Sequence, residues 1–302
     1  MDASMEISQT ASLPLSILRQ LRVRQWAKNL LVFVPLILIH RLDDPELFWR
    51  CLLTFLAFSS MASASYIIND FKDLSSDRDH PIKRERPLVA GTLSRGIAVA
   101  LIPVLIAVSL LLASLVSPTV TMVIAIYFGA TLSYTIFAKQ QVALDVVTLG
   151  LLYAIRLVAG GYAVEVPVSF WLIAFSMFLF LSLALVKRYS ETLEYGNDDD
   201  SLIAGRGYMK SDLPLLSQIG ISSGLISVLV LALYVNSEEV TVRYSSPELI
   251  WGLCPVATYW VCRIWTLATR GKLHDDPFLF ATYDRPTYVM AVVSLAIIWL
   301  AV

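Results

Sequence analysis

The sequence predicts an all-α polytopic membrane protein with nine transmembrane helices, and three observations support this fold class. Hydrophobic residues make up 57% of the 302 residues and charged residues only 16%, whereas soluble domains average about 45–50% apolar and about 25% charged residues. Apolar runs of membrane-spanning length recur along the chain, and most basic residues lie in alternate connections between these runs. The net charge of −1 gives no indication of a nucleic-acid partner.

Membrane spans can be counted by length, because a bilayer core of about 30 Å requires roughly 20 apolar residues in a helix. Nine runs approach this length: 27–41, 47–69, 95–116, 118–138, 142–163, 167–186, 213–235, 246–268 and 286–302. The first and last are the shortest. We therefore expect residues 1–25 to form a cytoplasmic tail or interfacial segment and residues 26–302 to form a single transmembrane domain.

The distribution of Lys and Arg predicts the orientation in the membrane. Eighteen of the 23 basic residues lie in the N-terminal segment and in connections that fall on one side of the nine expected spans. Only Arg41, Arg50 and Arg243 fall on the opposite side. Because basic residues accumulate in cytoplasmic loops, we expect a multi-pass protein of the bacterial inner (plasma) membrane, with its N-terminus inside and its C-terminus outside.

One cluster of polar residues follows the second expected span. Asn69, Asp70, Asp73 and Asp77 share one 100° arc of the helix surface if the helix continues through them. Like charges at this spacing repel each other, so the cluster favours a compensating cation such as Mg²⁺, which carboxylates, waters and substrate phosphates hold together. A solvated helix end is the simpler alternative, and the cost of acids near a membrane boundary disfavours it.

A basic segment follows this cluster. Lys83, Arg84 and Arg86 are either anchors of the positive-inside kind or clamps for a phosphate beside the metal, with Arg as a bidentate donor and Lys as a point charge. We favour the clamp, with Lys83 and Arg86 ahead of Arg84. His80 is expected to form hydrogen bonds within the loop and not to act as a base.

Polar residues also lie at the start of the first expected span. Gln25 and Trp26 precede Lys28 and Asn29, and a tryptophan at this place is typical of an interfacial anchor. Polar groups inside a span need partners. Lys28 and Asn29 therefore either face a phosphate site or extend to the membrane surface, and the sequence leaves both open.

Two charged residues lie within the fifth expected span. Asp145 and Arg156 are on the same face of the helix but about 16 Å apart along it, which excludes a direct ion pair. Arg156 is therefore expected to face a polar cavity or an anionic group. Tyr134 and Lys139 border the entry to the same span.

Charged residues also follow the sixth expected span. Lys187 and Glu191 either form a local i,i+4 pair, or Lys187 and Arg188 bind a phosphate across a cavity from the acidic cluster. Acids also lie in the two later connections between spans. Asp198, Asp199 and Asp200 are expected in a solvated loop, and His274, Asp275, Asp276 and Asp284 in helix caps or a lid.

Together these residues resemble a known family. The pattern from Asn69 to Asp77, at the end of the second of nine spans, resembles the UbiA superfamily of intramembrane prenyltransferases. Residues 24–29, 80–87 and 187–191 are similar to its decaprenyl-phosphate phosphoribosyltransferase branch. The resemblance implies a UbiA-like bundle around a central cavity open to the cytoplasmic side. It also implies Mg²⁺-dependent transfer of 5-phosphoribose from phosphoribosyl pyrophosphate (PRPP) to a polyprenyl (decaprenyl) phosphate, for cell-wall arabinan precursors.

The resemblance assigns roles to individual residues of this transmembrane catalytic domain. Asp73 and Asp77 are expected to be catalytic, and Asn69, Asp70, Asp73 and Asp77 to hold the magnesium ion. The expected substrate-binding residues are Gln25, Lys28, Asn29, Asn69, Lys83, Arg86, Tyr134, Lys139, Arg156, Lys187, Arg188, Tyr189 and Glu191.

One departure from the superfamily pattern bears on the substrate. Aromatic prenyltransferases of the superfamily carry a second Asp-x-x-x-Asp motif after the sixth span, where this chain has Lys187 and Arg188, with Glu191 as the acid in register. A basic group suits a phosphate that binds without a metal. An aromatic prenyltransferase that uses a prenyl diphosphate remains the alternative, while the one-sided loops disfavour a transporter. The sequence leaves the lipid chain length, the downstream pathway, the number of metal ions and self-association open.

Overall fold

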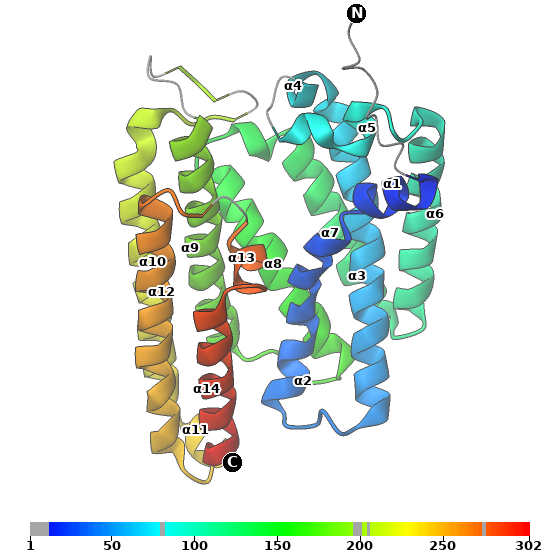
Figure 1. Cartoon of the computed structure of the whole chain (residues 1–302). Coiled ribbons are helices and arrows are strands. Elements are labelled where there is room, and N and C mark those ends of the chain that lie inside the picture. Colours follow the sequence, from blue (N-terminus) through cyan, green and yellow to red (C-terminus); the bar gives the residue numbers. More distant parts are fainter. Residues whose placement is uncertain (1–11, 79–81, 196–200, 204–205, 274–275) are drawn as a thin grey trace, which may run out of the picture.

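The computed structural model describes residues 12–78, 82–195, 201–203, 206–273 and 276–302. Every regular element within these residues is a helix, and the helices form one bundle (Figure 1). The predicted all-α class is therefore confirmed. The expected roles of His80, Asp198–Asp200, His274 and Asp275 concern residues that lie outside the described ranges.

Within the described ranges, six helices are long and apolar enough to cross a membrane. They are α3 (Pro45–Lys72), α6 (Arg95–Ser114), α7 (Pro118–Ile136), α8 (Leu144–Ala163), α9 (Phe170–Tyr195) and the stretch Lys210–Val235, which joins η4 (Lys210–Asp212) to α10 (Leu213–Val235). Each coincides with an expected span. The chain is an integral membrane protein. The start of α3 has an ordinary side-chain cap, because Asp44 accepts hydrogen bonds from Glu46 N and Leu47 N.

The other three expected spans are shorter or irregular helices. Residues 27–41 fall on η1 (Val23–Phe33), an 11-residue 3-10 helix, and on the 5-residue α2 (Val34–Leu38). A 3-10 helix rises about 2.0 Å per residue, so the two together extend about 30 Å with few residues. The remaining two are η5 (Pro247–Gly252) with the 17-residue α12 (Leu253–Thr269), and the 17-residue α14 (Arg285–Ala301). The predicted count of nine spans is therefore not confirmed.

The bundle has two sides. Figure 1 shows α3, α6 and α7 on one side and α9, α10, α12 and α14 on the other, with α8 between them. The short helices are α1 (Leu13–Gln20), α4 (Leu74–Arg78), η2 (Lys83–Glu85), α5 (Pro87–Ala90), η3 (Ala138–Gln140), α11 (Glu238–Arg243) and α13 (Pro277–Ala281). Helices α1, α4 and α5 lie at one end of the bundle and the C-terminus at the other. That the first end faces the cytoplasm stays a prediction from the charge distribution.

The irregular segment η1 is fixed in the bundle by polar contacts and by a close backbone approach. Trp26 Nε1 donates to Ser63 Oγ at 3.1 Å, and Asn29 Nδ2 donates to Ser59 Oγ at 3.0 Å, both on α3. On the other side, a Cβ at Gly160 of α8 would lie 2.2 Å from the carbonyl oxygen of Val32. Glycine lets helix backbones approach in membranes, so Gly160 determines how deeply η1 and its Lys28 sit.

We expect the substitution Gly160→Ala to destabilise the protein by about 1–3 kcal/mol, because the methyl group would force η1 away from α8. The matched control is Gly129→Ala in α7, where a Cβ would meet nothing within 4 Å and the helix should gain up to about 1 kcal/mol. The free energy of unfolding in mixed micelles measures both. Equal effects of the two substitutions would contradict the proposed close packing.

Candidate functional site

The acidic cluster begins where α3 ends. The helical hydrogen bonds continue past this point, from Asp73 N to Asn69 O at 2.9 Å and from Asp77 N to Asp73 O at 2.8 Å. However, Asp73 is the C-cap of α3, with φ −93° and ψ 8°, and α4 starts at the next residue. The acids therefore do not form one compact set: Asp70 and Asp73 contact different groups of residues.

Asp70 is the most enclosed acid of the cluster, with 1% of its side chain exposed. Its carboxylate accepts a hydrogen bond from Gln20 Nε2 at 2.7 Å and one from Arg86 Nη1 at 3.0 Å, and it forms an ion pair with Arg22. Arg86 also forms an ion pair with Asp77. Asp70 thus ties α1, α3 and the segment before α5 together, and its oxygens are already occupied.

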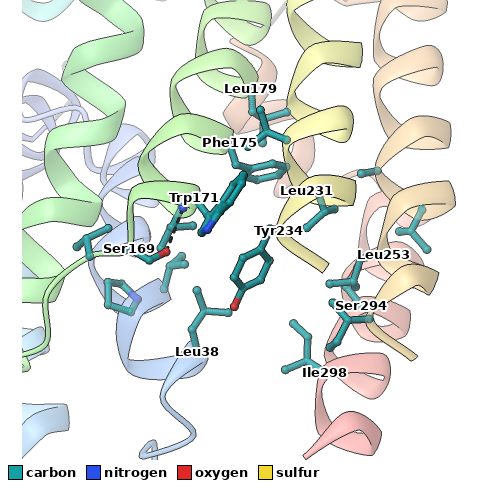
Figure 2. A pocket seen from close by; sticks show the side chains of 18 of the residues that line it. Leu38, Ser169, Trp171, Phe175, Leu179, Leu231, Tyr234, Leu253, Ser294 and Ile298 are labelled. Atoms are coloured by element: carbon teal, nitrogen blue, oxygen red, sulfur yellow. Dashed lines mark hydrogen bonds between the residues drawn. The ribbon is translucent and has the colours of Figure 1, made fainter. Parts of the chain in front are cut away.

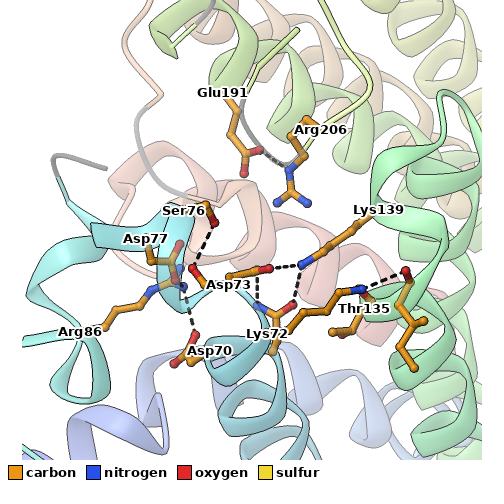
Figure 3. Close-up of polar contacts among 12 residues, drawn as sticks. Asp70, Lys72, Asp73, Ser76, Asp77, Arg86, Thr135, Lys139, Glu191 and Arg206 are labelled. Carbon is orange, nitrogen blue, oxygen red and sulfur yellow. Dashed lines mark hydrogen bonds and ion pairs between the residues drawn. The ribbon is translucent and has the colours of Figure 1, made fainter. Parts of the chain in front are cut away.

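Asp73 faces the other way, toward η3. It forms an ion pair with Lys139, and Asn69 Nδ2 donates to its second oxygen at 3.0 Å. Lys139 also approaches Asn69 Oδ1 at 3.4 Å. Figure 3 shows this arrangement, together with Lys72, which donates to the carbonyl oxygens of Thr135 and Ile136 at the end of α7. Asp73 is therefore linked to η3 and its neighbour Lys72 to α7, whereas Asp70 is linked to α1.

Asp77 completes the cluster from α4. It is buried, and this burial raises the pKa of its carboxyl group, while the guanidinium of Arg86 opposes the shift. A cation near Asp77 favours the charged form of the carboxylate in this environment. Arg86 supplies that cation in the present arrangement.

The donor set fits a magnesium ion by its chemistry. Asn69, Asp73 and Asp77 offer amide and carboxylate oxygens, which are the hard ligands that Mg²⁺ prefers. Within the described parts of the chain, no group of three or more His, Cys, Asp or Glu side chains lies close enough to hold a metal. Magnesium sites in proteins often take only one or two carboxylates and rely on waters and substrate phosphates for the rest.

A second polar group joins three distant parts of the chain. Lys28 Nζ of η1 and Lys187 Nζ of α9 lie 2.7 and 3.3 Å from the same oxygen, Oδ2 of Asp276, which precedes α13. The Tyr153 hydroxyl approaches the same carboxylate at 3.4 Å. Burial alone would raise the pKa of Asp276, but the two ammonium groups hold it well below its usual range. Of the two alternatives for Lys187, a local pair with Glu191 or a phosphate site, the first is not found: Lys187 pairs across the bundle with Asp276.

A third polar group surrounds Arg188, which is completely buried. Arg188 Nε donates to Asp145 Oδ2 at 2.7 Å, and its Nη1 forms an ion pair with Glu191. Tyr208 donates to the other oxygen of Asp145 at 2.6 Å. Burial, and then this hydrogen bond, raise the pKa of Tyr208, so its hydroxyl remains a donor. The guanidinium of Arg188 is therefore used within the protein.

Arg206 is a functional candidate that sequence reasoning did not single out. Its Nε lies 3.6 Å from Glu191 Oε2, and Figure 3 shows Arg206 and Glu191 above Asp73 and Lys139 in this view. The sequence indicated Arg206 only as one more basic residue of a charged connection. Its place beside Glu191 of α9 is set by the tertiary structure, which its position in the sequence does not indicate.

The remaining predicted residues take simpler positions. Arg156 Nε donates to Asn29 Oδ1 at 2.7 Å and its Nη2 to Tyr127 at 3.0 Å, so this buried cation has polar partners and does not contact Asp145, as expected. Gln25 Oε1 is buried with no hydrogen-bond partner in the described part of the chain. Tyr134 borders the third polar group, where it accepts from Arg188 at 3.5 Å, whereas Tyr189 packs edge-on against Trp265.

The last acids to be placed are the expected caps. Asp276 accepts from Phe278 N and Asp284 from Thr287 N at the starts of α13 and α14, which confirms capping for both. Asp284 also binds Arg263 with both oxygens, at 2.8 and 2.9 Å. The contact of Asp276 with two lysines was not predicted.

Comparison with known proteins now identifies the family. Residues 30–283 match the model of the UbiA prenyltransferase family. The chain belongs to that family. A UbiA homolog from Archaeoglobus fulgidus, solved with bound GPP and Mg²⁺, has a TM-score of 0.71 and 17% identity, covering 95% of this chain and 99% of that chain. This UbiA family member therefore shares the fold of a solved relative.

Relatives of this UbiA family member carry different names. Protein y4nM of Sinorhizobium fredii is 37% identical over 274 residues, 90% of this chain and 53% of that protein, so the chain spans about half its length. A decaprenyl-phosphate phosphoribosyltransferase of Mycobacterium tuberculosis is 35% identical over 185 residues, 60% of this chain and 61% of that protein. A 4-hydroxybenzoate octaprenyltransferase of Aliivibrio fischeri is 26% identical over 257 residues, 82% of this chain and 84% of that protein.

We expect Asp145→Asn to destabilise this UbiA family member by about 3 kcal/mol, because it removes one partner of a buried ion pair and leaves the Arg188 charge less compensated. The matched control is Asp44→Asn, since the ion pair of Asp44 with Arg41 is exposed and should change stability by less than about 1 kcal/mol. Unfolding in mixed micelles measures both. A loss at Asp145 no larger than at Asp44 would show that the buried network does not stabilise the fold.

Proposed function

We propose that the chain transfers 5-phosphoribose from PRPP to a polyprenyl phosphate and releases diphosphate. The observation that carries this proposal is the pair Lys28 and Lys187, whose ammonium groups meet at one carboxylate oxygen. A pair of cations at this place can bind a phosphate without a metal. The 35% identity to a protein named decaprenyl-phosphate phosphoribosyltransferase supports the same substrates.

The donor's diphosphate is assigned to the acidic cluster. Asp73 and Asp77 would hold a magnesium ion, with Asn69 assisting, and the ion would neutralise the diphosphate as it leaves C1 of the ribose. Asp70 was also expected to be a ligand, but its contacts with Gln20, Arg22 and Arg86 suit a positioning residue better. A relative solved with Mg²⁺ supports the metal.

Lys139 and Arg86 are expected to act both before and after the metal and the diphosphate bind. In the structure they neutralise Asp73 and Asp77. A divalent ion at these carboxylates would take over the neutralisation, and both side chains could then donate to diphosphate oxygens, Arg86 with two parallel bonds. Lys83 and Arg206 lie near Glu191 and suit the 5-phosphate. Gln25 Oε1, which has no hydrogen-bond partner among the described residues, suits a ribose hydroxyl.

The reaction itself needs little proton chemistry. An oxygen of the lipid phosphate forms a bond to C1, the bond between C1 and the diphosphate oxygen breaks, and the electron pair leaves with the diphosphate. The lipid phosphate is anionic at neutral pH, so no general base is required. The task of the protein is to hold two anions in line and to stabilise developing charge. One displacement inverts the anomeric centre.

The alternative, an aromatic prenyltransferase, has one supporting observation, the 26% identity to a 4-hydroxybenzoate octaprenyltransferase. It requires the diphosphate of a prenyl chain at the acidic cluster and an aromatic acceptor nearby. The place of the expected second acidic motif is taken instead by Lys187, paired with Asp276, and by Arg188, paired with Asp145. We therefore favour the phosphoribosyl donor, with the site facing the cytoplasm of a bacterial inner membrane.

We expect purified protein in lipid nanodiscs to form a lipid-soluble labelled product from labelled PRPP and a polyprenyl phosphate. EDTA should abolish the product and Mg²⁺ restore it. Asp73→Asn should lower kcat about 100-fold or more, because it removes a metal ligand that acts on the leaving group. The control Glu46→Gln changes an exposed acid at the other end of α3 and should leave kcat unchanged.

Two results would contradict this proposal. One is product formation from a prenyl diphosphate and an aromatic acceptor but none from PRPP. The other is equal activity of the Asp73 and Glu46 variants with PRPP, since a metal site at the end of α3 could not then carry the reaction.

A further inference from the structure

At the contact of Asp276 with Lys28 and Lys187, one carboxylate faces two ammonium groups. The two lysines and the aspartate are largely buried, with side-chain exposures of 9%, 29% and 5%. Asp276 reaches them from the connection between α12 and α14, far from both lysines in the sequence. These three side chains together carry a net charge of +1 in a poorly solvated place, and Glu191, which is shared with Arg188 and Arg206, opposes it only in part.

A lipid phosphate would change this balance. A phosphate monoester carries about −1.5 to −2 charges at neutral pH. It would compensate both lysines if Asp276 were absent, but beside Asp276 it would meet a like charge at short distance, which is unfavourable. The carboxylate and the phosphate therefore compete for the same two ammonium groups.

Two apolar cavities, which together we call the apolar tract, begin next to Asp276. The residues after Asp276, Pro277 and Phe278, line a cavity of about 210 Å³. Its walls Leu179 and Trp260 also line a second cavity of about 440 Å³ that extends to Leu38 at the end of α2 (Figure 2). Aliphatic and aromatic side chains make up nearly all of both walls. A long hydrocarbon chain with an anionic head fits such a tract, whereas a free sugar phosphate does not.

We propose that Asp276 is a resident counter-ion which occupies the site of the acceptor's phosphate, and that a polyprenyl phosphate displaces it from Lys28 and Lys187. This inference rests on the proposed function and adds a positioning residue to it. Without lipid, Asp276 compensates the lysines and keeps them in place. With lipid, the phosphate takes its position and the first isoprene units lie along the apolar tract.

The exchange gives the site selectivity for the charge of the head group. A polyprenol has no charge to offer the lysines, so it cannot replace the carboxylate. A phosphate monoester can, because its second negative charge compensates the second lysine. Displacement has a free-energy cost that appears as a higher acceptor KM, since an acceptor binds only to the fraction of protein in which the lysines are available.

The test measures KM for the polyprenyl phosphate and for PRPP separately in nanodiscs. We expect Asp276→Asn to lower the acceptor KM about tenfold, because the competitor is removed, and to leave the PRPP KM unchanged. Lys187→Gln should raise the acceptor KM. The matched control is Asp284→Asn, an acid of the same connection that caps α14 and binds Arg263, and it should change neither KM.

A second variant guards against misfolding of Asp276→Asn, which leaves two lysines without their carboxylate. The double variant Asp276→Asn with Lys187→Gln has the same net charge at this site as the wild type. We expect its acceptor KM to lie below that of Lys187→Gln alone. If removing Asp276 leaves the acceptor KM unchanged or raises it in both backgrounds, Asp276 is not a competitor and the inference is wrong.

A binding measurement separates this inference from the proposed function. Native mass spectrometry of the reconstituted protein with a polyprenyl phosphate, and with the corresponding polyprenol, reports lipid binding without catalysis. If PRPP yields no product, but Asp276→Asn binds the phosphate more tightly and the polyprenol no better, the donor assignment fails and the counter-ion exchange stands. If PRPP yields product but Asp276→Asn binds the phosphate no more tightly, the donor assignment stands and the counter-ion exchange fails.

Discussion

The arrangement of the site depends on the pairing of buried charges. Transfer of an isolated charge into a poorly solvated interior is costly, and the cost falls only when an opposite charge or several hydrogen bonds are supplied. In this protein each acid of the main cluster has such a partner: Asp70 has Arg22 and Arg86, Asp73 has Lys139, and Asp77 has Arg86. Because the partners come from η1, η3 and the segment before α5, the pairs also position these elements.

The long helices could be predicted from sequence, and the reason is the solvent. In a bilayer every backbone group must be satisfied within its own segment, so a run of about 20 apolar residues leaves little choice but a helix. That is why α3, α6, α7, α8, α9 and α10 match their expected spans. The first span was less predictable, because its polar residues take distant partners: Lys28 pairs with Asp276, just before α13, and Asn29 donates to Ser59 of α3. The segment that carries them, η1, is a 3-10 helix.

The candidate site could be predicted only where its residues are close in sequence. The acidic cluster spans nine positions, so its spacing was informative, although the turn at Asp73 separates Asp70 from Asp73. The contact between Lys28 and Asp276 joins residues 248 positions apart, and no local pattern indicates which of several acids in the connection before α14 will reach the lysines. Asp276 does so because Phe278 stacks on Tyr153, with ring centroids 5.2 Å apart, and fixes α13 against the bundle.

The pairing of charges also bears on how a substrate enters. A site that holds its cations on resident carboxylates is already organised before the substrate arrives, so little reorganisation is needed at the moment of reaction. In the proposed reaction the same carboxylates would then be neutralised or displaced: Asp73 and Asp77 would stay in place and hold a metal, whereas Asp276 would leave. The two proposed anion sites therefore differ in kind. One gains a positive charge to accept a diphosphate, the other releases a negative charge to accept a monophosphate, and this difference keeps the donor and the acceptor from exchanging places.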